Sequence, residues 1–273
     1  MSFIPQRKKP RLKKVVAFFV VMYLAITLVL YFYQDNILFR PTVLAQDFEY
    51  QFAHPFEELF LKPERDVVIN AIHFKAKKPK GVILYFHGNA GDLSRWGKIT
   101  EYFVEMDYAV LVMDYRTYGK SLGALTEEAL YSDAQFCYDY LKKSYTEQDI
   151  TVYGRSLGTA IATYVASKNN PKHLILETPY YSMVDVAQSG FPLLPIKYLL
   201  KYKLPTYKLV EKVECNILMI HGTEDEVIKI DSAQKLFEVA PQDSTTFITV
   251  EGAEHNNLIK FSEYHKAIKN LLQ

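Results

Sequence analysis

The chain has few of the residues that mark a metalloprotein or a protein held together by disulfide bonds. Its 273 residues include only two cysteines, Cys137 and Cys215, and contain no H-x-x-H or C-x-x-C pattern. Cys137 lies in a predicted helix and Cys215 just before a predicted strand, with no spacing that pairs them, so we expect two buried thiols. The loop "HGNAGD" lacks the Gly-Lys-Ser/Thr of a phosphate-binding loop. We therefore expect neither a metal site nor another cofactor.

Acidic residues are absent from the first fourteen positions, which carry six basic ones: Arg7, Lys8, Lys9, Arg11, Lys13 and Lys14. Removing these six leaves 26 basic residues against 31 acidic ones, a balance of −5 for the remainder. A basic face for nucleic acid is therefore not suggested, and no nucleic-acid partner is expected. The length allows one sizeable α/β domain and an appendage.

Charge is also absent from Val15–Tyr33, whose nineteen residues are long enough, as a helix of roughly 28 Å, to cross the hydrocarbon core of a bilayer. A buried core helix or a cleaved signal peptide are the alternatives. The run has no polar stripe, and it closes on bulky residues instead of a small-residue cleavage site, which favours an uncleaved transmembrane anchor. The basic residues 1–14 then form a cytoplasmic tail. The rest of the chain is expected outside the cytoplasm, which is the periplasm in a Gram-negative bacterium and a lumen in a eukaryote.

The remaining residues predict an α/β protein. Residues 34–66 are expected to form a connector, and a domain follows over 67–273, starting with a strand at 67–74. Near-continuous apolar strands begin at 81, 108, 150 and 173 and alternate with helices, which indicates a mostly parallel sheet covered by helices on both faces. The pattern lapses over about 183–212, which we interpret as a small apolar cap inserted over the mouth of the pocket. It then resumes to the end of the chain.

A serine between two glycines is the first candidate for chemistry. The G-x-S-x-G pattern "GRSLG", residues 154–158, arises by chance about once in ten chains of this length, so its setting decides. A β-branched and aromatic run precedes Ser156 and a helical pattern follows it. This setting predicts a nucleophile elbow at a sharp turn between strand and helix. A serine hydroxyl needs a base and an orienting acid elsewhere in the chain.

Asp225 and His255 are the predicted partners of Ser156. Both follow predicted strands, and catalytic groups gather at the carboxyl ends of parallel strands. The order serine, aspartate, histidine is that of one class of triad enzymes. Glu224, Glu226 and Asp114 are the rival acids, and we expect structural or surface roles for the other histidines: His54, His73, His87, His173, His221 and His265.

Hydrogen-bond donors for an oxyanion are predicted at two backbone amides. The N–H of Leu157 directly follows the nucleophile. The second donor is expected from the loop "HGNAG", where the N–H of Asn89 is the first candidate and that of Ala90 the second. The alternative for this loop is simple chain reversal, which its two glycines would also permit.

With "HGNAG", "MDYRTYGKS", "GRSLG", "HGTEDEVI" and "GAEHNNL" in this order, residues 60–273 resemble the α/β-hydrolase superfamily. They are most similar to its membrane-anchored branch of serine aminopeptidase-like hydrolases, which includes protein depalmitoylases, and "ILFRPT" after the apolar run is typical of that branch. The resemblance implies the α/β-hydrolase fold and triad roles for Ser156, Asp225 and His255. One departure is Thr117, where the branch often has glycine.

The function expected is hydrolysis of an ester, thioester or amide through an acyl-enzyme. The bond cleaved is not determined by these residues. The apolar cap and the tether favour a lipid-like or acylated substrate, either a small molecule, a lipid or an acylated protein. Two alternatives from another class are a non-catalytic binding module and a membrane-tethered assembly protein. Both are disfavoured because the full set of catalytic residues is present.

Overall fold

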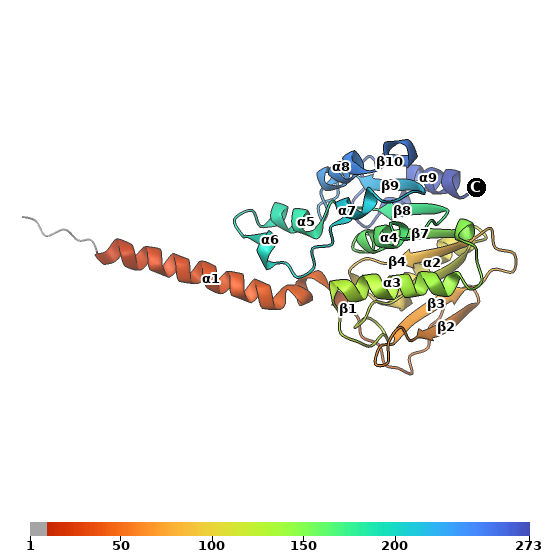
Figure 1. Cartoon of the computed structure of the whole chain (residues 1–273), viewed down its shortest axis with the longest axis horizontal. Helices are drawn as coiled ribbons and strands as arrows, with labels where there is room; N and C mark the ends of the chain where they lie inside the picture. The colour runs from red at the N-terminus through yellow and green to blue at the C-terminus, as the bar shows by residue number, and fades with distance from the viewer. Residues whose placement is uncertain (1–9) are drawn as a thin grey trace, which may run out of the picture.

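The computed structural model describes residues 10–273, so residues 1–9 of the predicted basic tail lie outside the described part. Figure 1 shows a long helix, α1, that projects from a body built of a sheet and its covering helices. The strands are β1 (Arg40–Pro41), β2 (Phe56–Leu61), β3 (Ile69–Phe74), β4 (Val82–Phe86), β5 (Ala90–Gly91), β6 (Ala109–Met113), β7 (Ile150–Arg155), β8 (His173–Glu177), β9 (Asn216–Gly222) and β10 (Thr245–Val250). The α-helices are α1 (Pro10–Leu38), α2 (Leu93–Val104), α3 (Glu127–Leu141), α4 (Gly158–Ala166), α5 (Met183–Gly190), α6 (Ile196–Leu199), α7 (Thr206–Val210), α8 (Ile230–Val239) and α9 (Ser262–Leu272).

Eight of these strands form one sheet in the order β10-β9-β8-β7-β4-β6-β3-β2. The six strands from β10 to β6 are parallel, while β3 pairs antiparallel with both β6 and β2. Five of the parallel strands, β4, β6, β7, β8 and β9, are apolar runs whose central residues are buried on both faces, whereas the central residues of the edge strand β10 are half-buried or exposed. The predicted mostly parallel sheet is therefore confirmed.

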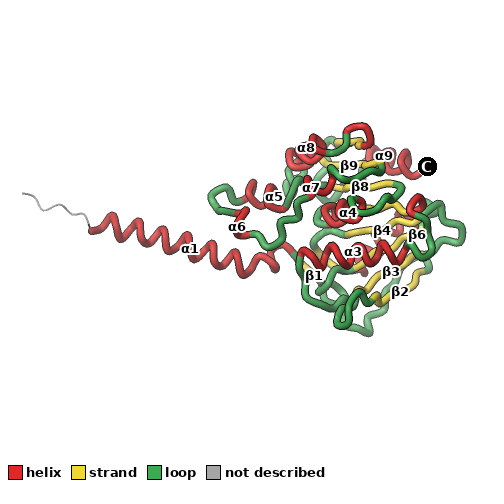
Figure 2. The backbone as a smooth tube through the Cα atoms, viewed as in Figure 1, coloured by secondary structure: helices red, strands yellow, loops and turns green. Residues whose placement is uncertain are grey.

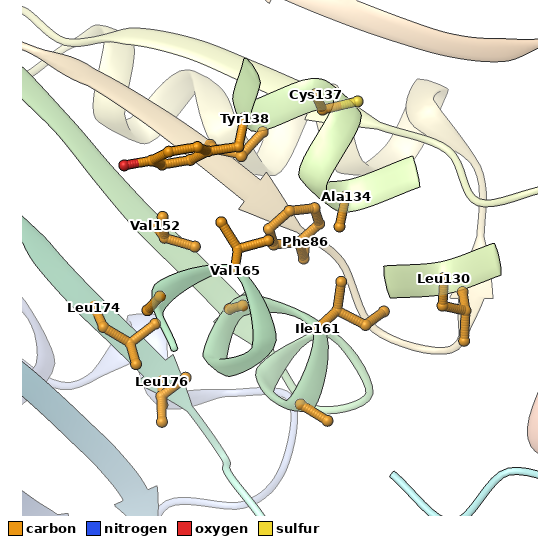
Figure 3. Close-up of a cluster of buried hydrophobic side chains, with 14 of the residues drawn as sticks. Phe86, Leu130, Ala134, Cys137, Tyr138, Val152, Ile161, Val165, Leu174 and Leu176 are labelled. Carbon is orange, nitrogen blue, oxygen red and sulfur yellow. The ribbon is translucent and has the colours of Figure 1, made fainter. Parts of the chain in front are cut away.

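Two layers of helices cover the sheet, as predicted. Helices α3, α4 and α8 contribute to one hydrophobic core, and α2 and α9 to the other. Figure 3 shows Leu130 and Ala134 of α3 and Ile161 and Val165 of α4 gathered around Phe86 at the end of β4. The first core also contains Cys137, and both cysteines are buried and unpaired, as the sequence suggests.

The segment predicted as a cap separates into two parts. Helix α7 packs on the body against α4 and α8, whereas α5 and α6 lie beside α1, away from the sheet (Figures 1 and 2). An apolar cavity between them is lined by Leu30, Gln34, Ile37, Leu38, Ala187, Phe191, Leu194, Ile196, Leu199 and Leu200. Ala187 of α5 and Ile196 and Leu199 of α6 therefore face the end of α1, whereas Met183 and Val186 of α5 pack on the core of the body.

Helix α1 begins before the predicted span and continues past it to Leu38. Within the described residues there is one helical segment, Leu12–Leu38, whose length and apolar composition would allow it to cross a membrane. Its apolar side chains are largely exposed. The predicted connector 34–66 contains the last turn of α1 and the strands β1 and β2. β1 pairs with β5 in the loop "HGNAG".

The turn between β7 and α4 depends on a close approach of two backbones. A Cβ atom on Gly158 would lie 2.1 Å from the carbonyl oxygen of Phe86 and 2.8 Å from that of His87. Both contacts are with backbone, which cannot move aside as a side chain can. Only glycine therefore lets α4 start directly behind the end of β4.

We expect Gly158→Ala to lower the free energy of unfolding by about 1–3 kcal/mol or more, because overpacking a rigid site forces the backbone apart. Gly190→Ala is the matched control, since nothing lies within 4 Å of a Cβ there. Urea denaturation of the full chain in detergent, followed by circular dichroism, measures both. Equal effects of the two substitutions would contradict the steric argument.

Candidate active site

Ser156 occupies the turn between β7 and α4 in a left-handed backbone conformation with a φ of 51°. This conformation is uncommon for a residue other than glycine. It is held on both sides, because the N–H of Ser156 donates to the carbonyl of Glu177 at 2.9 Å and its own carbonyl accepts from Thr159 N at 2.9 Å. A strained serine fixed in a tight turn is the geometry of a nucleophile elbow.

The three predicted triad residues lie in one hydrogen-bonded chain. His255 Nε2 is 2.9 Å from Ser156 Oγ, and His255 Nδ1 is 2.7 Å from Asp225 Oδ2. Because a carboxylate only accepts hydrogen bonds, Nδ1 must carry the proton in this arrangement. Nε2 is then the free acceptor that faces the serine hydroxyl, which is the tautomer a general base needs.

Asp225 is held as a buried anion by several donors. Its Oδ1 accepts from the backbone N–H of Val227 at 2.9 Å and of Ile228 at 2.8 Å, while Oδ2 faces His255 and His221. Burial by itself would raise the pKa of this carboxyl. The hydrogen bonds from His221, His255 and Ile228 outweigh burial and hold the pKa well below its usual range. Asp225 is therefore ionised at neutral pH.

His221 is a contact of the site that the sequence analysis assigned only a structural role. Its Nε2 lies 2.9 Å from the carbonyl of Ile228 and 3.3 Å from Asp225 Oδ2. Both neighbours are acceptors, so Nε2 carries a proton and helps to orient the carboxylate. The signal available in the sequence was its place, four residues before Asp225 at the end of a strand.

The rival acids and bases lie elsewhere. Glu224 and Glu226 flank Asp225 but are exposed, and Glu226 pairs with Lys229. Asp114 and His87 form a separate buried pair, in which His87 Nε2 is 3.3 Å from Asp114 Oδ1. The remaining histidines have no contact with Ser156 among the residues that the structure describes: His54, His73, His173 and His265.

A second buried ion pair that the sequence analysis missed lies beneath the triad. Arg155 Nε is 3.3 Å from Glu177 Oε1, and the other oxygen of Glu177 accepts from the Tyr153 hydroxyl at 2.6 Å. Arg155 also donates to Asn256 Oδ1 at 3.3 Å. The hydrogen bond between Arg155 and Asn256 joins the residue before Ser156 to the residue after His255. It therefore restrains both residues of the contact between Ser156 Oγ and His255 Nε2.

The loop "HGNAG" lies beside Ser156, where a second oxyanion donor is predicted. Gly88, Asn89 and Ala90 line the same cavity as the serine. Within residues 10–273, neither the N–H of Asn89 nor that of Leu157 donates a hydrogen bond to another group of the chain. Both amides are therefore free for a ligand, and their role as oxyanion donors stays a prediction.

A cavity of about 370 Å³ opens at the triad. Its lining residues are Arg40, Gly88, Asn89, Ala90, Arg95, Trp96, Arg155, Ser156, Val227, His255 and Asn256. No residue of the predicted cap 183–212 is among those lining this cavity, so the expected apolar channel under the cap finds no support there. Leu194, Ile196 and Leu199 of that segment instead line an apolar cavity beside the end of α1. The described residues also contain no group of three or more His, Cys, Asp or Glu that could hold a metal.

Known proteins are similar to this chain in fold and in sequence. A family model described as Serine aminopeptidase, S33 (Hydrolase_4) matches residues 77–209. A structure of the esterase Pf2001 from Pyrococcus furiosus is similar in fold, with a TM-score of 0.67 over 86% of this chain and 97% of the esterase, at 17% identity. The chain therefore has the α/β-hydrolase fold, and its residues 77–209 match the serine aminopeptidase S33 family.

Two curated relatives are similar in sequence. Alpha/beta hydrolase domain-containing protein 17C of Xenopus tropicalis is 31% identical over 196 residues, which is 70% of this chain and 61% of that protein. An uncharacterised protein of Mycobacterium tuberculosis is 29% identical over 177 residues, 64% of this chain and 63% of that protein. The chain thus spans a little under two thirds of the length of these relatives.

The ionised state of Asp225 predicts a pH-dependent contribution to stability. Its pKa is lower in the folded chain than in the unfolded chain, where it is about 3.9. The contribution is therefore present above pH ~4 and is lost as the pH falls through the folded pKa. Asp225→Asn should cost about 1–3 kcal/mol of unfolding free energy at neutral pH, and the gap to the wild type should narrow in acid.

Denaturant titrations of both proteins in detergent at neutral and acidic pH measure this gap. Glu226→Gln is the matched control, since Glu226 is an exposed neighbour of Asp225. A gap between wild type and Asp225→Asn that stays constant with pH would contradict the assignment.

Proposed function

We propose that the protein is a membrane-anchored serine hydrolase that transfers an acyl group from its substrate to Ser156 and then to water. The observation that carries this proposal is the hydrogen-bonded chain from Ser156 through His255 to Asp225. A non-catalytic binding or assembly module is the alternative. A binding or assembly module would not need a histidine in the tautomer of a general base beside a serine in a strained backbone conformation. The geometry therefore favours the enzyme.

In this mechanism His255 Nε2 takes the proton of the Ser156 hydroxyl as the serine attacks the acyl carbonyl. Asp225 stays ionised and stabilises the imidazolium that forms. The N–H groups of Leu157 and Asn89 donate to the oxyanion of the tetrahedral intermediate, each with a benefit of roughly 10²–10³ in rate. His255 then protonates the leaving group. Water, activated by the same imidazole, releases the acyl group as a carboxylic acid.

The substrate side of the proposal stays open between an ester, a thioester and an amide. A lipid-like or acylated substrate was expected from an apolar channel under the cap, and the lining of the cavity no longer supports that route. Arg40 and Arg95 instead stand at the cavity. Both are exposed, and in the described chain no carboxylate lies within ion-pair distance of either, whereas Arg155 is already paired with Glu177. Two unpaired cations beside the nucleophile favour a substrate with an anionic group near the bond that is cleaved.

The membrane side of the proposal rests on α1. We infer that residues 15–33 form the anchor, with residues 1–14 as a cytoplasmic tail and the domain 67–273 on the far side of the membrane. The support is the length and apolar character of Leu12–Leu38 and the excess of basic residues before it. In a Gram-negative bacterium the domain would then be periplasmic. A transmembrane anchor also accounts for a long apolar helix with mostly exposed side chains.

We expect Ser156→Ala to lower the hydrolysis of p-nitrophenyl esters by roughly 10⁴-fold or more, because no other group on this site replaces the nucleophile. Labelling by a fluorophosphonate probe should disappear with it. The melting curve should stay close to that of the wild type, since the change removes a single oxygen. Ser189→Ala, at an exposed serine of α5, is the control and should keep both activities. Full activity of Ser156→Ala would end the proposal.

The arginine pair predicts a preference that depends on charge. We expect Arg40→Gln and Arg95→Gln each to lower kcat/KM for mono-p-nitrophenyl succinate roughly two- to five-fold, as for a solvent-exposed ion pair, and to leave p-nitrophenyl butyrate unchanged. Raising the salt concentration should likewise reduce the preference of the wild type for the succinate ester over the butyrate ester. Arg65→Gln, at an exposed arginine away from the cavity, is the control. Equal effects on the two esters would contradict the charge argument.

A further inference from the structure

The tip of the α5–α6 segment is hydrogen-bonded to the middle of α1. The hydroxyl of Tyr23 donates to the carbonyl of Leu193 at 3.1 Å. Nearer the body, the side chain of Gln34 donates to the carbonyl of Leu199 at 3.1 Å and accepts from the backbone N–H of Lys201 at 2.8 Å. These contacts fix both ends of the segment along α1. Figures 1 and 2 show α5 and α6 beside this helix.

The contact with Tyr23 sets the depth of the tip if α1 crosses a bilayer. A hydrocarbon core of about 30 Å takes about 20 helical residues, and every such window within Leu12–Leu38 includes Tyr23. Tyr23 therefore lies roughly 12–22 Å inside the hydrocarbon from the side of the domain, at whichever height α1 crosses. Leu193, which is bonded to it, lies at the same depth.

The surface of the tip fits this environment. Residues 190–196, "GFPLLPI", carry no charge, and Leu193 and Tyr198 are 87% and 83% exposed. Such exposure of large apolar groups is unfavourable in water and favourable in lipid. The first basic residue, Lys197, is exposed and has a stem long enough to carry its ammonium toward the headgroups.

The backbone of the tip also fits a membrane, where an unsatisfied carbonyl is costly. Four successive carbonyls of this non-helical loop accept hydrogen bonds from side chains. The amide of Gln188 is shared by three of them, those of Phe191 (3.3 Å), Pro192 (3.1 Å) and Leu194 (3.4 Å), and Tyr23 donates to the fourth. In water these carbonyls would need no such partners.

We propose that the tip, residues 190–198, is inserted from the side of the domain into the hydrocarbon core of the bilayer that α1 crosses. Its partner is the acyl-chain region of a lipid bilayer. This inference rests on the proposed anchor, and it assigns the cap a different role from covering the active site. Anchor and tip together then hold the domain in one orientation on the membrane, because two separated attachments prevent rotation about α1.

The test places an environment-sensitive dye at single introduced cysteines of the full chain in phosphatidylcholine vesicles. Burial raises the pKa of both native thiols, so the dye reacts first with an exposed new one. Leu193→Cys probes the tip and Val29→Cys probes the anchor. Asn270→Cys, on α9 near the C-terminus at the end of the body away from α1, is the control. Lipids with a nitroxide in the middle of the acyl chains quench only dyes inside the hydrocarbon.

We expect the dyes at 193 and 29 to lose most of their fluorescence and the dye at 270 to keep it. Quenching at 29 without quenching at 193 would overturn the insertion of the tip and leave the anchor standing. Quenching at neither position would overturn the anchor, and the insertion with it, while the serine chemistry would be untouched. Tyr23→Phe should shift the dye at 193 toward the surface, since it removes the hydrogen bond that sets the depth.

Discussion

The contact between Gly158 and the carbonyl end of β4 is the constraint on which the geometry of the site depends. It lets α4 begin directly behind the sheet, which forces the chain to reverse within two residues of β7. Ser156 takes up that reversal in a left-handed conformation, and its hydroxyl is thereby aimed at His255. A larger residue at 158 would separate α4 from β4 and move the serine away from the loop "HGNAG".

Paired buried charges hold the rest of the site in place. Asp225 lies among donors from two histidines and two backbone amides, and Arg155 and Glu177 form a second pair under the serine. Removing one member of a buried pair leaves an uncompensated charge, which costs far more than the pair contributes when it is whole. These networks therefore act less as sources of stability than as restraints on the distance between Ser156 and His255.

The sequence predicts what depends on local pattern and on chain order. Continuous apolar runs identified the central parallel strands because those strands are buried on both faces. The position after a strand identified Asp225 and His255. Side-chain contacts between distant elements leave no such pattern. The contact between Arg155 and Glu177 was missed for this reason, whereas His221 lies only four residues before Asp225 and had a signal in its position after a strand. The packing of α5 and α6 on α1 was missed for the same reason, since an apolar segment is equally suited to cover a pocket, a helix or a membrane.

A pair of hydrogen bonds joins the end of α1 to the loop "HGNAG" beside Ser156. Two residues past α1, the N–H of Arg40 donates to the carbonyl of Asn89 at 2.8 Å, and the Asn89 side chain donates back to the carbonyl of Leu38 at 3.1 Å. The loop proposed to bind the oxyanion is thus held by the end of the apolar helix. With α1 in a bilayer, the cavity and its arginines lie close to the level of the lipid headgroups. Arg40 and Ser156 line one cavity at that level, so Arg40 would attract the anionic group of a substrate whose acyl carbonyl lies at the serine.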